Sequence, residues 1–197
     1  MEGDWVLDQF IGSGTTLIEA KLLGRNAVGV DINSKAISLS KNNLNFDSKT
    51  NSKVFIQQCS ATKLSFLKDD SIDLVCTHPP YANAIRYSSS IDGDISLLEY
   101  EEFLGQMGAV ATEAYRVLKS GGICAYMIGD VREHGSIKPL GMESMKKFCE
   151  AGFILKEIII KEQHNCRSTT YWEQKPHKFY LLAHEYIFIL EKKFSDR

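Results

Sequence analysis

The first 31 residues contain a pattern that strongly constrains the fold. Trp5-Val6-Leu7-Asp8 is a short apolar run that ends in an acid, and the glycine turn Gly12-Ser13-Gly14 follows it. Residues 15–23 carry apolar side chains at helical spacing, and residues 27–31 are a second apolar run that ends in Asp31. A buried strand, a tight turn, a helix and a second buried strand are typical of a parallel α/β unit.

The rest of the chain continues this alternation of apolar runs and amphipathic stretches. We expect further strands at 54–56, 72–77, 123–128, 153–161 and 180–191, and helices at about 34–45, 99–118 and 140–150. Prolines, serines and Gly93 predict a long loop without regular structure at 79–96, and residues 119–122 predict a turn. The last two strands can pair as a hairpin across a polar excursion, 163–178. The sequence therefore predicts one α/β domain over residues 1–197, with a mostly parallel seven-stranded sheet, helices on both faces and an antiparallel C-terminal hairpin.

Composition excludes several classes of protein. Apolar residues make up 44% and charged residues 24% of the chain, which is a globular balance, and no apolar run is long enough to cross a membrane. The N-terminus has no basic region followed by an apolar region, so we do not expect secretion. Five widely spaced cysteines predict reduced thiols in a cytoplasmic protein, and the histidines lack the spacing of metal ligands.

The charge distribution is only weakly informative about partners. The net charge of −2 does not by itself indicate nucleic-acid binding. Residues 131–197 hold twelve basic and nine acidic side chains, which an anionic partner and an ordinary solvated surface explain equally well.

The glycine turn and Asp31 together predict a binding site for a nucleoside cofactor. The glycines allow close approach of a ligand to the start of a helix, and Asp31 is placed to accept the two hydroxyls of a ribose. Both features belong to carboxyl ends of parallel strands, which meet at one edge of the sheet. The predicted cofactor-binding residues in this region are Asp8, Phe10, Gly12, Ser13, Gly14, Thr15, Thr16 and Asp31.

The same segment favours S-adenosylmethionine over a dinucleotide. A dinucleotide site usually has a third glycine three residues after the second, where this chain has Leu17. Asp8 disfavours a phosphate group but suits the positively charged amino acid part of S-adenosylmethionine.

The fourth strand leads directly into His78-Pro79-Pro80-Tyr81. Two prolines fix a rigid, extended corner, and the aromatic residue after them can stack on a planar ring. Taken alone, this segment is better explained as a rigid strand exit with a surface tyrosine.

Considered together, these motifs resemble the S-adenosylmethionine-dependent amino-methyltransferases that modify cytosine N4 or adenine N6 in DNA. Residues 8–16 resemble the cofactor motif of that family, His78-Pro79-Pro80-Tyr81 resembles its catalytic motif, and Tyr115–Gly122 resembles the helix and turn before its fifth strand. The resemblance covers residues 3–191 and implies a Rossmann-like methyltransferase fold.

The resemblance also implies a reaction, which is direct methyl transfer to an exocyclic amine. His78 and the backbone carbonyls after it would accept hydrogen bonds from the amine, and Tyr81 would stack on a base flipped out of the duplex. Positioning and electrostatic stabilisation would provide the catalysis, without a covalent intermediate.

The chain departs from the family pattern in three places. The family has Asp, Asn or Ser where this chain has His78. Ser60 stands near the place of an acid that contacts the adenine amino group, and its hydroxyl is a weaker substitute. The family motif that precedes the first strand and completes the methionine pocket is absent. We expect either that the sequence is truncated or that a C-terminal segment, a homodimer or a partner chain supplies that surface.

The excursion at 163–178 combines basic and aromatic side chains, which suits contact with nucleic acid. The residues concerned are Arg167, Tyr171, Trp172, Lys175 and Lys178. An ordinary hairpin tip explains the same composition equally well.

Three functions remain open from the sequence. The first is a site-specific DNA amino-methyltransferase, as in restriction-modification. The second applies the same chemistry to RNA or to a protein amide. The third is a non-catalytic subunit with a methyltransferase fold.

Overall fold

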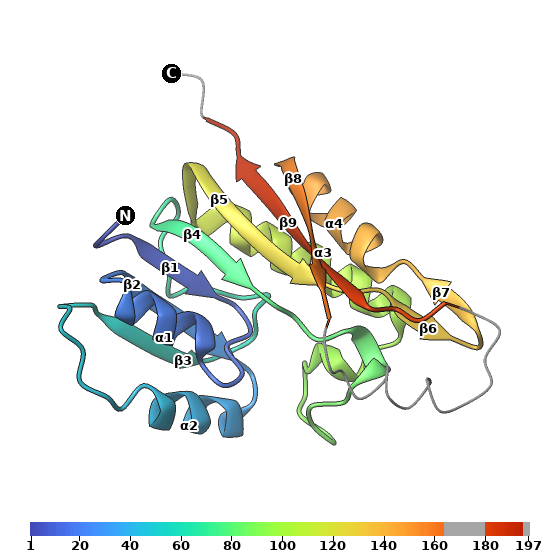
Figure 1. Cartoon of the computed structure of the whole chain (residues 1–197), viewed down its shortest axis with the longest axis horizontal. Helices are drawn as coiled ribbons and strands as arrows, with labels where there is room; N and C mark the ends of the chain where they lie inside the picture. The colour runs from blue at the N-terminus through green and yellow to red at the C-terminus, as the bar shows by residue number, and fades with distance from the viewer. Residues whose placement is uncertain (164–179, 195–197) are drawn as a thin grey trace.

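A computed structural model describes residues 1–163 and 180–194 of the chain. Seven strands form one twisted sheet in the order β3-β2-β1-β4-β5-β9-β8, and two short strands, β6 and β7, form a separate hairpin (Figure 1). The strands are β1 (Trp5–Asp8), β2 (Asn26–Asp31), β3 (Val54–Gln58), β4 (Ile72–Thr77), β5 (Leu118–Ile128), β6 (Val131–Glu133), β7 (Ser136–Lys138), β8 (Phe153–Glu162) and β9 (His184–Lys192). The α-helices are α1 (Thr15–Leu22), α2 (Ser34–Asn43), α3 (Tyr100–Val117) and α4 (Leu140–Glu150).

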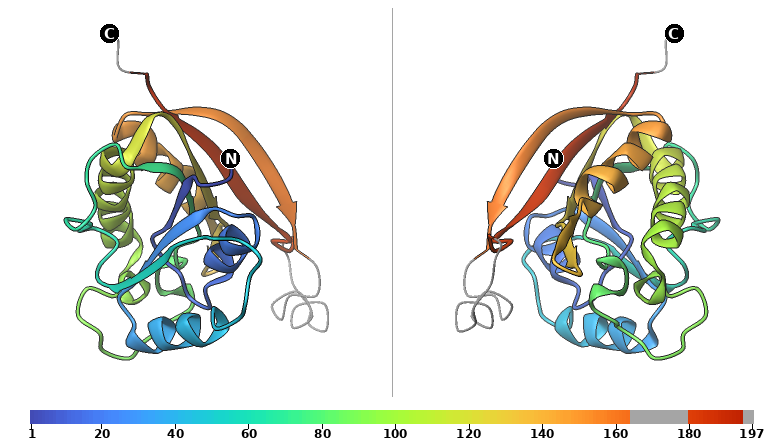
Figure 2. Two further views of the ribbon diagram at one scale, coloured as in Figure 1. Left: turned by 90° about the vertical axis from the view of Figure 1, so that its left-hand side faces the viewer. Right: turned by 90° about the vertical axis from the view of Figure 1, so that its right-hand side faces the viewer.

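The sheet has the predicted mixture of directions. Strands β1 to β5 pair in parallel, while β9 is antiparallel to both β5 and β8. Helix α1 lies on one face of the sheet, and α3 and α4 lie on the other (Figure 2). The predicted fold class is confirmed, including the antiparallel C-terminal hairpin.

The core lies mainly between the sheet and helices α3 and α4. Tyr126 on β5 is fully buried and stacks on Phe148 of α4 with ring centroids 4.4 Å apart, and its cross-strand neighbour Phe188 of β9 lies with its ring centroid 6.2 Å away. The Tyr126 hydroxyl bonds to Ser144 at 2.9 Å, so its polar atom is satisfied inside the core. The C-terminal hairpin is thereby fixed to the rest of the domain.

The turn predicted at 119–122 is wrong, because these residues belong to β5. Ile72 of β4 pairs with Leu118 of β5, whereas Leu74 of β4 pairs with Ile123, so β5 has more residues than β4 between the two pairs. The additional residues on β5 form a bulge, so the strand continues through a segment whose glycines indicated a chain reversal.

The loop at 79–96 also contains more structure than expected. Two single-turn 3-10 helices occupy Ala82–Ala84 and Ile95–Leu97. Asp94 starts the second of them by accepting a hydrogen bond from the backbone N–H of Ser96 at 2.9 Å. Such short helices carry no periodicity that a sequence can reveal.

The β6–β7 hairpin was not predicted. Its two-residue turn is His134-Gly135, and both residues have positive φ, 47° and 80°. This is the backbone of a tight hairpin turn, for which a residue pair ending in glycine is the available signal.

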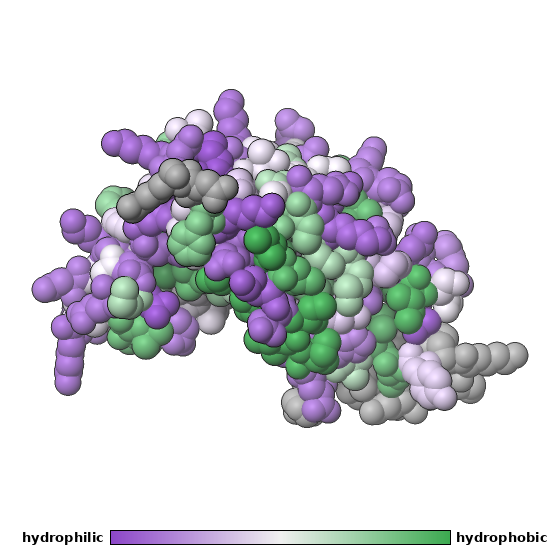
Figure 3. All heavy atoms as spheres, turned by 90° about the horizontal axis from the view of Figure 1, so that it is seen from above, coloured by the Kyte–Doolittle hydropathy of each residue, from purple (hydrophilic) through white to green (hydrophobic). Residues whose placement is uncertain are grey.

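The last strand in the sheet order, β8, is an edge strand with apolar side chains at the surface. Ile154, Ile158, Ile159 and Ile160 expose between 38% and 58% of their area. The view from above shows hydrophobic side chains gathered in the middle of the molecule with polar side chains around them (Figure 3). No helix among the described residues is long and apolar enough to cross a membrane.

Candidate functional site

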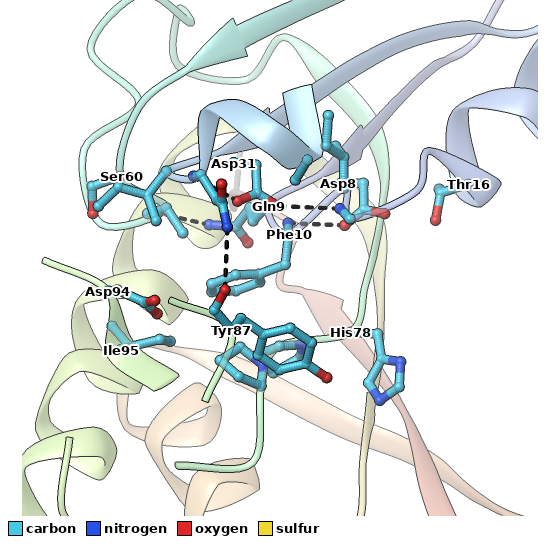
Figure 4. Close-up of a pocket in the computed structure, with 18 of the residues that line it drawn as sticks. Asp8, Gln9, Phe10, Thr16, Asp31, Ser60, His78, Tyr87, Asp94 and Ile95 are labelled. Atoms are coloured by element: carbon cyan, nitrogen blue, oxygen red, sulfur yellow. Dashed lines mark hydrogen bonds between the residues drawn. The ribbon is translucent and has the colours of Figure 1, made fainter. Parts of the chain in front are cut away.

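A cavity of about 490 Å³ lies at the carboxyl ends of strands β1 to β4. Its wall includes residues at the ends of four strands, namely Asp8 to Thr16 after β1, Asp31 to Asn33 after β2, Ser60 to Thr62 after β3 and His78 to Pro80 after β4. Residues within 79–98, which connect β4 to α3 and are called the covering loop below, also line it. Figure 4 shows Asp8, Phe10 and Asp31 along one side, with Tyr87 and His78 on the other. The volume is in the range of small-molecule sites, and the position is where open α/β sheets bind ligands.

The glycine turn shapes one end of the cavity. Gly12 and Gly14 have φ of +49° and +89°, a region that side chains other than glycine disfavour. A Cβ atom on Gly14 would lie 3.2 Å from Ser40 of α2, so this glycine also allows α2 to pack closely. Helix α1 begins directly afterwards at Thr15, and its N-terminus therefore faces the cavity wall.

Asp31 is held in place by two backbone groups. Its Oδ2 accepts from the N–H of Gly12 at 3.1 Å, and its Oδ1 accepts from the N–H of Asn33 at 2.9 Å. Burial raises the pKa of Asp31 and outweighs these hydrogen bonds, which lower it. The carboxylate is oriented at the cavity edge with capacity for further donors, such as the hydroxyls of a ribose.

Asp8 is almost completely buried at the end of β1. Its Oδ1 accepts hydrogen bonds from the N–H of Phe10 at 3.0 Å and from the Thr77 hydroxyl at 3.1 Å. Burial is the main cause that raises the pKa of Asp8. The ion pairs among residues 1–163 and 180–194 do not include Asp8.

The corner after β4 forms the opposite wall. His78, Pro79 and Pro80 all line the cavity, and the His78 side chain is 43% exposed. His78 Nε2 lies 2.8 Å from the Tyr81 hydroxyl, which also donates a hydrogen bond to Glu185 of β9. Burial lowers the pKa of His78, the Glu185 carboxylate raises it and Lys161 lowers it.

The structure brings together most of the predicted cofactor residues. Asp8, Phe10, Gly12, Ser13, Thr15, Thr16, Asp31 and Ser60 all line the cavity, while Gly14 forms the turn behind it. The Ser60 hydroxyl lies 2.8 Å from that of Thr62 at the end of β3. Tyr81 is not part of the cavity lining, and its phenol faces Glu185 and His78. Arg167, Tyr171, Trp172, Lys175 and Lys178 lie outside the described residues.

Sequence reasoning missed three residues of this region. Tyr87 lines the cavity, and its backbone carbonyl accepts from Asn33 at 3.3 Å. Asp94 also lines the cavity and bonds to Ser88 within the covering loop. Glu185 has a side chain that is only 7% exposed. The sequence offered little indication of these residues beyond an aromatic side chain within a loop, at Tyr87, and an acid within the apolar β9 segment, at Glu185.

The sheet order, with one reversed strand and a cavity at the carboxyl ends of its parallel strands, is that of a Rossmann-like methyltransferase fold. A crystal structure of a methyltransferase from Methanosarcina mazei, described as SAM-dependent, superposes with a TM-score of 0.65. The superposition covers 99% of this chain and 95% of the M. mazei chain at 18% sequence identity, so the two proteins share a fold.

Sequence comparison then gives the family. The chain matches the DNA methylase family, N6_N4_Mtase, over residues 1–42 and 72–195, and it belongs to that family. The expected resemblance to amino-methyltransferases is thereby confirmed.

Two curated relatives show how much of the chain can be aligned with individual proteins. The chain is 31% identical over 106 residues to the Type II methyltransferase M.MjaVI of Methanocaldococcus jannaschii, covering 54% of this chain and 53% of that protein. It is 35% identical over 102 residues to a tRNA (guanine(10)-N2)-dimethyltransferase of Methanothermobacter thermautotrophicus, covering 52% and 28% respectively. The match thus spans about half or less of the length of these relatives.

Proposed function

We propose that the chain transfers a methyl group from S-adenosylmethionine to the exocyclic amine of a DNA base, cytosine N4 or adenine N6. The observation that carries the proposal is the arrangement of one cavity. It has Asp8, Asp31 and the glycine turn along one wall and His78-Pro79-Pro80 along the other. A cofactor held by the first wall would present its reactive group toward the second.

The residues present fit the cofactor. Asp31 would accept the ribose hydroxyls, and the buried Asp8 would pair with the amino group of the methionine part. Ser60 would contact the adenine ring at the end of β3, and the backbone N–H groups of residues 12–16 would contact the methionine part. When bound, the cofactor supplies an electrophilic methyl group.

The second wall would position the amine. The His78 ring and the Pro79 carbonyl would accept hydrogen bonds from its two N–H groups, so that the nitrogen lone pair faces the methyl group. Tyr81 does not line the cavity, but its ring lies beside that of His78 with centroids 5.5 Å apart, so a base held against His78 would lie next to the Tyr81 ring. This geometry favours positioning and fixed dipoles as the source of catalysis.

DNA is the first choice of substrate because several similar proteins are named Type II methyltransferases. Guanine in tRNA is the second, because the tRNA relative matches over a comparable length and its reaction also concerns an exocyclic amine. Basic and aromatic residues at 163–178 would contact the nucleic acid. We further propose that the protein is cytoplasmic.

The test is incubation with labelled S-adenosylmethionine and separate pools of duplex DNA, tRNA and protein. Label in DNA is the expected result, and digestion to nucleosides identifies the methylated base. Label only in tRNA or protein contradicts the DNA assignment. Cofactor binding without label in any pool favours the non-catalytic subunit.

A further inference from the structure

Four side chains form a continuous hydrogen-bonded series from the cavity wall to the C-terminal hairpin. His78 contacts the Tyr81 hydroxyl, Tyr81 bonds to Glu185, and Lys161 of β8 donates to the other oxygen of Glu185 at 2.6 Å. His78 and Tyr81 follow β4, whereas Glu185 and Lys161 come from strands at the far end of the sheet order. We call this series the His78–Lys161 network.

The packing around Glu185 shows that the network is closely built. The Glu185 side chain is 7% exposed and lies beside Gly129, which follows β5. A Cβ atom on Gly129 would lie 3.3 Å from the Tyr81 ring and 3.4 Å from Glu185. A glycine at this position therefore lets the phenol and the carboxylate lie close to the backbone that follows β5.

The number of protons fixes the direction of each hydrogen bond. Burial opposes ionisation of Glu185, but the hydrogen bonds from Lys161 and Tyr81 hold its pKa below the usual range, so it accepts only. Tyr81 has one hydroxyl proton and donates it to Glu185. The Tyr81 oxygen therefore accepts from His78 Nε2–H, which leaves Nδ1 of the neutral ring without a proton.

We propose that Glu185 is a positioning residue that acts through Tyr81 to hold His78 in the Nε2–H form, with Nδ1 available as the hydrogen-bond acceptor for the substrate amine. The proposal rests on the proposed function, since it assigns a role within that reaction. It explains how an imidazole serves where a carboxylate or amide oxygen would otherwise accept. Without a fixed tautomer, the ring would present a donor to the amine for part of the time.

The charges that face His78 come from two strands of the hairpin. Glu185 on β9 favours the protonated ring, and Lys161 on β8 disfavours it, while Tyr81 contributes a neutral phenol. Removal of the Glu185 charge should therefore lower the pKa of His78, and removal of the Lys161 charge should raise it.

The experiment is ¹⁵N NMR of the imidazole of His78 in the full chain, as a function of pH. In the parent protein we expect the proton on Nε2 of the neutral ring. Glu185→Leu should transfer the preference toward Nδ1–H, because the freed Tyr81 hydroxyl then donates to Nε2, and the titration midpoint should fall. Lys161→Gln should keep the tautomer and raise the midpoint. Glu157→Gln, which removes an exposed carboxylate from the same hairpin, is the matched control and should change neither.

A parent protein with the proton on Nδ1, or a Glu185→Leu variant with parental tautomer and midpoint, overturns the proposal. If Glu185→Leu does not fold, Tyr81→Phe removes the accepting oxygen and should weaken the tautomer preference in the same measurement. The NMR measurement needs no substrate, so the tautomer of His78 can be determined even in a chain that methylates nothing. Absence of methylation would refute the proposed function, whereas the NMR result tests the role of Glu185. In an active chain, the acid limb of methyl transfer should move to lower pH in Glu185→Leu and to higher pH in Lys161→Gln.

Discussion

Asp31 and His78 show what single residues reveal and conceal. Asp31 was predictable because it ends a strand at a fixed distance from a glycine turn, and local sequence alone determines that geometry. The partners of His78 were not predictable, since Glu185 lies 104 residues after Tyr81 and only the assembled sheet brings them together. Tyr87 was missed for a related reason, because its place over the cavity depends on the path of the covering loop.

Replacement of Asp31 by alanine should weaken cofactor binding. Loss of the ribose hydrogen bonds costs of order 1–3 kcal/mol, which corresponds to roughly 5- to 150-fold in Kd. Calorimetry with the demethylated cofactor product measures it directly. Asp47→Ala, at an exposed position after α2, is the control and should bind as the parent does. An unchanged affinity in the Asp31 variant would sink the ribose assignment.

The pH dependence of methyl transfer should follow His78. Protonation turns both ring nitrogens into donors, so activity falls as the pH drops through the His78 pKa. Burial lowers this pKa, so the decline is expected below about pH 6.5, the reference value for histidine. His78→Asn should keep some activity and lose the acid limb. His134→Asn changes an exposed histidine of the β6–β7 turn and should leave the profile intact. Parental turnover and pH profile in His78→Ala would instead assign the acceptor role to the Pro79 carbonyl.

At the level of elements, strands and helices followed from periodicity, but irregular backbone did not. Residues 119–122 contain two glycines, and only pairing with β4 shows that they form a bulge within a strand. The β6–β7 hairpin is too short to show an apolar alternation. By contrast, α2 begins at Ser34 as expected, and the structure shows that the preceding Asn33 caps it, since its side chain accepts from the Lys35 N–H at 2.9 Å.

Asn33 joins two elements, and its roles can be separated by mutation. Asn33→Ala removes the cap of α2 and the contact to the Tyr87 carbonyl, and should cost about 1 kcal/mol in the free energy of unfolding. Asn33→Ser keeps a capping oxygen, so it should recover most of that stability while the 79–98 loop becomes more susceptible to proteolysis. Urea unfolding and limited proteolysis of both variants measure the two effects. Equal destabilisation of both variants would contradict the capping role.

At the level of the whole molecule, the fold class and the location of the cavity at the carboxyl ends of the strands were predictable, whereas contact with a partner was not. Arg167, Lys175 and Lys178 are expected to bind nucleic-acid phosphates. Their simultaneous replacement by alanine should weaken DNA binding and flatten its salt dependence by roughly one unit of slope for each phosphate that is no longer neutralised. Replacement of the exposed Lys35, Lys41 and Lys49 removes the same charge elsewhere and is the control. A parental salt slope in the first variant would make the excursion an ordinary hairpin tip.

The position of β9 between β5 and β8 has a consequence for synthesis on the ribosome. Strand β8 emerges first, yet β9 lies between it and the rest of the sheet, so a nascent chain that ends before β9 carries an isoleucine-rich strand with no neighbour in the sheet. The same strand brings Glu185 to Tyr81. Closure of the sheet and completion of the His78–Lys161 network therefore both wait for the synthesis of β9. Until β9 has left the exit tunnel, the nascent chain has an aggregation-prone edge and no assembled His78–Lys161 network.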